Sequence, residues 1–69
     1  MSVYKVIEIV GTSTSSWEDA AVTAVNTARE TLRDLRVAEV VEQDLDVGGD
    51  EVIFRTKLSV SFKYEGDRI

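Results

Sequence analysis

Residues 52–64 read VIFRTKLSVSFKY, a stretch in which two sets of side chains alternate strictly. The mainly apolar set is Val52, Phe54, Thr56, Leu58, Val60, Phe62 and Tyr64. Between its members stand Ile53, Arg55, Lys57, Ser59, Ser61 and Lys63. Successive side chains of a β-strand point to opposite faces of the sheet, so this period of two predicts a strand with one buried face. A strand of about 14 residues would be roughly 45 Å long, at about 3.3 Å per residue.

The residues before this strand predict a hairpin. Gly48-Gly49-Asp50 is a compact connection, because glycine adopts positive φ angles without steric cost. Residues 37–47 are strand-like, with apolar side chains on one parity and mostly acidic ones on the other. The apolar parity is Val37, Val41, Leu45 and Val47, and the other is Ala38, Glu42, Asp44 and Asp46.

A helix is expected further upstream. Apolar residues recur there every three or four positions, at Trp17, Ala21, Ala24, Ala28, Leu32 and Leu35. Ser15 with Glu18 has the spacing of a capping box, and Ser16 with Asp19 offers the alternative register. The sequence therefore predicts a helix from about Ser16 to Leu35, with two carboxylates at its positive end.

Residues 3–10, VYKVIEIV, predict a first strand, and the small polar residues 11–16 predict a loop. The order β-α-β-β predicts an α+β fold, a three-stranded antiparallel sheet in the order 1-3-2 packed on one helix. The chain forms a single domain, residues 1–69, in which 65–69 are expected to fray. A helix of about 18–20 residues covers only about 30 Å, so the long strand is expected to overhang and to curl or pair with another subunit.

The composition points to binding rather than catalysis. The chain has 69 residues with 8 basic and 13 acidic side chains, a net charge of −5, and no His or Cys. Disulfides and the usual zinc or haem ligands are therefore excluded, and so are the His-based and Cys-based nucleophile pairs. So small a domain usually needs a disulfide, a metal or oligomerisation. Self-association, or a cation bound by carboxylates, remains, and we expect a protein that is not an enzyme.

The charge and hydropathy also limit partners. An acidic surface does not suit the phosphates of nucleic acid, and the chain has no apolar run of the roughly 20 residues that span a membrane. Because the first residues lead directly into a strand rather than forming a signal peptide, we expect a soluble, cytoplasmic protein without nucleic-acid or membrane partners.

Four segments together resemble one protein family. They are VYKVIEIVGTS at 3–13, ARETL at 28–32, AEVVEQ at 38–43 and VSF at 60–62. In this order and at this length they resemble the dodecins over nearly the whole chain. The resemblance implies a hollow homododecamer that binds and stores a small ligand, in most members flavin held in pairs between subunits.

Two positions depart from the flavin-binding members. Those proteins have a stacking Trp after the helix, where this chain has Val37, and a flavin-bonding Gln in the last strand, where it has Arg55. The resemblance places the ligand pocket at Val37, Glu42, Gln43 and Arg55, and the two departures imply that binding of riboflavin or FMN is weakened or lost. Arg55 is expected there to pair with Glu42 or to attract an anion. The single Trp, Trp17, is expected to be a core or interface residue.

The segments LRVA at 35–38 and EQD at 42–44 are more similar to the calcium dodecins, which lack the stacking Trp. This similarity implies a divalent cation such as Ca²⁺ as the ligand. The candidate ligands are oxygen-bearing residues that could meet between subunits: Ser15, Glu18, Asp19, Glu42, Asp44 and Asp46. Residues 44–55 are not an EF-hand loop, because Gly48 and Arg55 stand at its fifth and twelfth positions.

Three alternatives stay open at this point. A solvated acidic turn explains residues 44–51 without any metal. In place of a cation-binding shell, the protein could be a flavin-storing dodecin with an altered pocket. It could also be a purely structural oligomer that presents its acidic surface to a protein partner.

Overall fold

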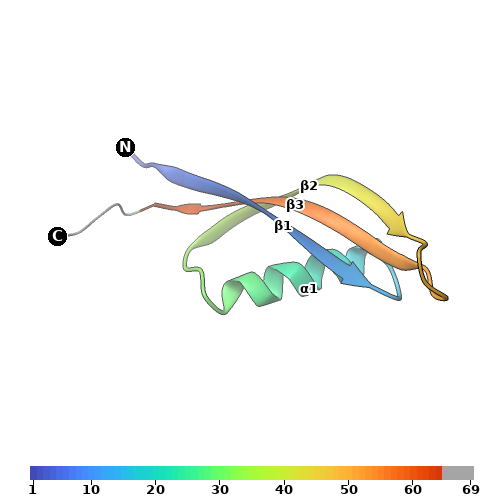
Figure 1. Ribbon diagram of the computed structural model, residues 1–69. Coiled ribbons are helices and arrows are strands. Elements are labelled where there is room, and N and C mark those ends of the chain that lie inside the picture. The colour runs from blue at the N-terminus through green and yellow to red at the C-terminus, as the bar shows by residue number, and fades with distance from the viewer. Residues whose placement is uncertain (65–69) are drawn as a thin grey trace.

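The computed structural model describes residues 1–64 of the chain. In this range the elements are β1 (Tyr4–Ser13), α1 (Trp17–Arg29), β2 (Leu35–Asp46) and β3 (Ile53–Lys63). Within the described residues the strands form one sheet in the order β1-β3-β2, with both pairs antiparallel (Figure 1). The predicted α+β architecture is confirmed. The tail predicted at 65–69 lies outside the described residues.

Helix α1 packs against one face of the sheet and leaves the other face open (Figure 1). The end of the sheet near the two termini, where Tyr4 pairs with Lys63, continues past the helix. The expected overhang is therefore present, although β3 has 11 residues rather than about 14. We call the side that faces α1 the inner sheet face and the opposite side the outer sheet face.

The core is small and lies between α1 and the centre of β3. Its buried apolar residues are Ala20 and Ala24 of the helix and Leu58 and Val60 of the strand. Thr56 is fully buried on the same parity of β3, as the alternating sequence predicts. Because the buried helix residues are both alanines, with Val25 packing at the side, the helix lies close to the sheet.

Gly11 is part of β1 rather than of the predicted loop, which shifts the end of that strand from residue 10 to Ser13. Its lack of a side chain allows the close approach of the helix: a Cβ atom here would overlap the main-chain oxygen of Ala20 and lie 2.9 Å from the Cβ of Ala24. Gly11 therefore marks a contact between layers, and the strand continues through it.

The helix begins as predicted but ends earlier. Ser16 is the N-cap, and its hydroxyl accepts a 2.9 Å bond from the main-chain N–H of Asp19, so the second of the two capping registers is the one adopted. The predicted end at Leu35 is wrong, because α1 ends at Arg29. The chain turns at Asp34, whose φ of 59° is one that Asp tolerates better than most residues. Leu35 is already in β2 and packs on the core from there.

The predicted parity of β2 is also wrong. Register shifts between Leu35 and Val37 and between Val40 and Glu42 interrupt the alternation. As a result Val37 lies opposite Ser61 on the outer sheet face, whereas Leu45 lies opposite Phe54 on the inner one. A bulge of this kind moves all the following side chains to the other face, which strict periodicity does not reveal.

Candidate functional site

The outer sheet face carries charged side chains at the hairpin end of β2 and β3. Cross-strand neighbours in an antiparallel sheet project to the same side, so Asp44 of β2 stands beside Arg55 of β3, and Glu42 beside Lys57. Val10 of β1 lies opposite Lys57 and completes the group. We call these five residues the charged depression: they line a shallow hollow of about 180 Å³.

Asp44 and Arg55 form a two-pronged ion pair. The Arg55 Nε donates to one carboxylate oxygen of Asp44 at 2.7 Å, and an Nη donates to the other at 3.0 Å. These hydrogen bonds from the guanidinium lower the pKa of the Asp44 carboxyl below its ordinary value, and Lys57 adds a smaller effect of the same sign. The same hydrogen bonds raise the pKa of Arg55. Both groups are therefore charged at neutral pH.

The second pair is looser. Nζ of Lys57 lies 3.4 Å from a carboxylate oxygen of Glu42, in a single contact. The expected pairing of Arg55 with Glu42 is wrong: Arg55 pairs with Asp44. The β2 bulge sets Glu42 opposite Lys57 instead. In one chain the depression is thus internally neutralised, with two acidic and two basic groups.

The four residues predicted to line a ligand pocket do not meet within one chain. Glu42 and Arg55 both line the charged depression. Gln43 lies opposite Thr56, whose side chain is buried on the inner sheet face, and Val37 lies at the far end of β2, opposite Ser61. Any pocket that uses all four must draw them from more than one chain.

The six predicted metal ligands fall into two groups. Ser15, Glu18 and Asp19 stand at the start of α1, and Glu42, Asp44 and Asp46 lie on β2. Within residues 1–64 no three acidic groups come close enough to hold a metal ion.

Four of these carboxylates have partners of their own, and one of them is Glu42, which lies 3.4 Å from Nζ of Lys57. Asp19 accepts a 2.7 Å bond from the Ser13 hydroxyl, and Asp46 accepts a 3.0 Å bond from the main-chain N–H of Gly48. Asp44 is held by Arg55.

Trp17 joins the helix start to the hairpin. Its indole N–H donates to the main-chain oxygen of Asp44 at 3.0 Å, and its ring packs edge-on against Phe54 with centroids 5.1 Å apart. The buried hydroxyl of Thr56 donates to the main-chain oxygen of Trp17 at 2.9 Å. Trp17 itself is half-buried, as expected for a core or interface position. Its bond to Asp44 spans 27 positions, and no local sequence signal indicated it.

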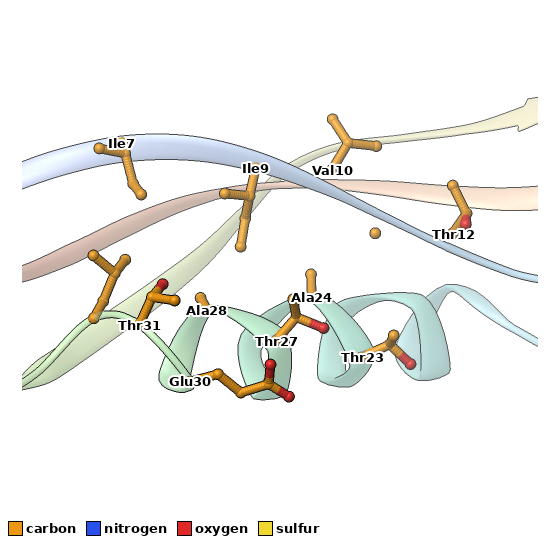
Figure 2. Close-up of a pocket in the computed structure, with 12 residues that line it drawn as sticks. Ile7, Ile9, Val10, Thr12, Thr23, Ala24, Thr27, Ala28, Glu30 and Thr31 are labelled. Atoms are coloured by element: carbon orange, nitrogen blue, oxygen red, sulfur yellow. The ribbon is translucent and has the colours of Figure 1, made fainter.

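A second and larger hollow lies on the other side of the molecule, between β1 and α1. It measures about 530 Å³ and is mostly apolar. Ile7 and Ile9 project from β1 towards the helix, and Ala24 and Ala28 face them from α1, whereas Val10 points to the opposite side of the strand (Figure 2). Glu30 is the charged residue among those that line it. The groove is open, and its exposed lining is mainly apolar apart from Glu30 and four threonines, so it resembles an uncovered contact surface more than a site for a polar ligand.

No helix in the described part of the chain has the length and apolar character needed to cross a membrane.

Comparison with known proteins places this geometry in a family. The family model described as Dodecin matches residues 3–65. Calcium dodecin of Mycobacterium tuberculosis is 56% identical over 64 residues, which cover 91% of this chain and 90% of that protein.

Solved structures agree with this match. A crystal structure of the same Mycobacterium tuberculosis protein, described as a calcium-chelating antigen with a novel calcium-binding site, is 51% identical. It has a TM-score of 0.85 and covers 99% of each chain. Dodecin from Streptomyces coelicolor is 31% identical, with a TM-score of 0.87 and coverage of 96% of each chain. The chain therefore belongs to the dodecin family.

Proposed function

We propose that the protein is a self-assembling binding and storage protein, a homododecamer whose ligand is a divalent cation, calcium in the first instance. One observation carries the choice of ligand: the 56% identity with calcium dodecin extends over nine-tenths of both chains. The charged groups of the outer sheet face and of the helix start supply oxygen atoms of the kind that calcium prefers.

The exposed apolar surface supports self-assembly. Three valines of the outer sheet face are largely exposed to solvent: Val6 is 59% exposed, Val10 51% and Val37 61%. Apolar side chains gathered on one exposed face are typical of a surface that another protein covers. The strands β1 and β2 also present free edges. A second copy of the chain is the proposed cover for these surfaces.

Assembly would also explain why the candidate metal ligands lie far apart in a single chain. A symmetric oligomer repeats every carboxylate, so groups that lie apart in one chain can converge at a symmetry axis. Asp44 and Glu42 already have cationic partners, and a cation that used them would have to replace Arg55 or Lys57. Calcium binding at this face would therefore depend on the ionic strength and on the two basic residues.

Two residues support the view that flavin binding is weakened. Val37 offers no ring on which an isoalloxazine could stack, and Arg55, which stands where flavin-binding dodecins have a Gln, is already engaged by Asp44. A flavin-storing protein with an altered pocket is the second candidate. It would be favoured by quenching of riboflavin or FMN fluorescence with submicromolar affinity.

Calorimetric titration tests the proposed ligand. Purified, metal-free protein is titrated with calcium chloride, beside the variants Asp44→Asn and Glu18→Gln and with magnesium as the competing ion. We expect saturable heat with the wild type and at least a tenfold weaker affinity in one of the two variants. Absence of heat and of any thermal shift at millimolar calcium would contradict the proposal. It would leave the structural oligomer that presents an acidic surface to a protein partner.

We also propose that the protein has no enzymatic activity, since the sequence lacks His and Cys and the described site contains no nucleophile beside a base. The cytoplasmic location expected from the sequence stays a prediction.

A further inference from the structure

Two neighbouring ion pairs on the outer sheet face differ in quality, although their surroundings are alike. Both join β2 to β3, and Arg55 and Lys57 are two residues apart on the same strand. The Asp44–Arg55 pair makes two bonds, at 2.7 and 3.0 Å, whereas the Glu42–Lys57 pair makes one contact at 3.4 Å. Both are solvent-accessible, with Asp44 41% and Glu42 57% exposed. Part of the difference follows from the side chains, because a planar guanidinium can make two parallel bonds whereas an ammonium group acts as a single point charge.

An exposed ion pair gains little because two mobile side chains must be held in one geometry. A two-pronged Arg–carboxylate pair is the most demanding case, since both planar groups must be aligned. The cost falls when the backbone that carries one of the partners is already fixed. Asp has only two side-chain torsions, so the placement of its main chain largely decides where the carboxylate lies.

The main chain of Asp44 is fixed in this way, by a hydrogen bond that we call the Trp17 anchor. The indole N–H of Trp17 donates to the Asp44 main-chain oxygen, and the Trp17 main chain is in turn held by the buried Thr56 hydroxyl. The Phe54 ring fixes the orientation of the indole from the side. The start of α1 lies on the inner side of the sheet (Figure 1). It is thereby linked to Asp44, whose side chain bonds to Arg55 on the outer face. Among the hydrogen bonds of the described residues, no side-chain donor holds the main chain of Glu42 in this way.

We propose that Trp17 is a positioning residue for the Asp44–Arg55 ion pair, acting through the indole bond to the Asp44 main chain. With the pair closed, Nε and one Nη of Arg55 are bonded to the two carboxylate oxygens of Asp44, so a charged ligand in the depression competes with these bonds. The strength of this anchor then sets how readily the depression accepts a charged ligand. That last consequence rests on the proposed function, whereas the link from Trp17 to Arg55 does not.

A double-mutant cycle tests the link in the ligand-free protein. Trp17→Phe keeps an aromatic ring against Phe54 but removes the N–H, and Arg55→Gln removes the ion pair. The matched control is Lys57→Gln, which removes the unanchored pair on the same strand. Unfolding by urea is measured at one protein concentration for each single and double variant.

We expect the loss in the Trp17→Phe/Arg55→Gln double variant to be smaller than the sum of the two single losses, by at least about twofold in the unfolding constant. The Trp17→Phe/Lys57→Gln losses should add. Additive losses in both cycles would overturn the proposal, because two residues on opposite faces would then act independently.

A second measurement does not depend on the stability of the Trp17 variant. The chain contains a single Trp, so its fluorescence reports on this one indole. We expect Arg55→Gln to increase quenching of the indole by acrylamide by about 1.5-fold or more, and Lys57→Gln to leave it unchanged. Equal quenching in the wild type and in Arg55→Gln would contradict the proposal. Neither measurement contains calcium, so failure here and failure of the calcium titration are separate results.

Discussion

The two faces of the sheet are stabilised by different forces. The inner face is closed by a few small or branched side chains, Ala20, Ala24, Leu58 and Val60, packed between α1 and β3. The outer face carries two exposed ion pairs between β2 and β3 and leaves valines uncovered. The buried contacts of the inner face therefore stabilise the fold, whereas the outer face is the one that we propose for assembly and for a ligand.

The largest effect is expected from the inner face. Leu58→Ala removes a side chain that is 1% exposed and leaves a cavity beside the helix. We expect the free energy of unfolding to fall by about 2–5 kcal/mol, measured by urea denaturation. The matched control is Ser59→Ala, one position along on the outer face, which should change it by less than about 0.5 kcal/mol. Equal losses in the two variants would remove the distinction between the faces.

The close contact of the helix with β1 gives the next effect. Gly11→Ala places a methyl group against the Ala20 main-chain oxygen, so the layers must separate, and we expect a loss of about 1–3 kcal/mol. Gly49→Ala is the control, because a Cβ there has no neighbour within 4 Å. A thermal melt of both variants decides the matter: a Gly11 variant as stable as the Gly49 variant would mean that the layers can separate freely.

A gain of function is expected on the outer face. Val37→Trp combined with Arg55→Gln restores the two groups that flavin-binding dodecins use. Ring stacking contributes about 1–3 kcal/mol, which is roughly a 5- to 150-fold gain in FMN affinity relative to Arg55→Gln alone. The readout is quenching of FMN fluorescence. An unchanged affinity would mean that Val37 does not face the ligand pocket of the assembled protein.

The smallest effect is electrostatic and depends on pH. The pKa of Asp44 is lowered in the folded protein, so the ion pair stabilises the fold above the ordinary pKa of an aspartate, about 3.9, and this contribution is lost as the pH falls through the lower folded-state value. Asp44→Asn should therefore be slightly less stable than the wild type at pH 7, and this difference should shrink as the pH falls below the ordinary pKa of an aspartate. A stability difference that grew on acidification would have the wrong sign.

The sequence predicted the elements better than their ends. The alternation of β3 and the order of the four elements were read correctly, because each is a local pattern that burial imposes. The end of α1 at Arg29 was missed because no glycine or proline marks it, and the left-handed residue, Asp34, comes only at the entry to β2. The parity of β2 was missed because a bulge changes the register without changing the composition.

The candidate site was predicted less completely. Arg55 and Glu42 were identified as pocket residues from the family resemblance, and both line the charged depression. The predicted partner of Arg55, Glu42, was wrong because the strand register places Asp44 opposite Arg55. The bond from Trp17 to Asp44 was not predicted, because it depends on packing between elements that are distant in the sequence. Residues that meet only between subunits cannot be paired from one chain.

The central claim is that the outer face and the strand edges are covered by further copies of the chain. Size-exclusion chromatography with light scattering measures this directly. The account predicts a single species of about twelve times 7.7 kDa, stable on dilution. A species of 7.7 kDa at micromolar concentration would contradict it.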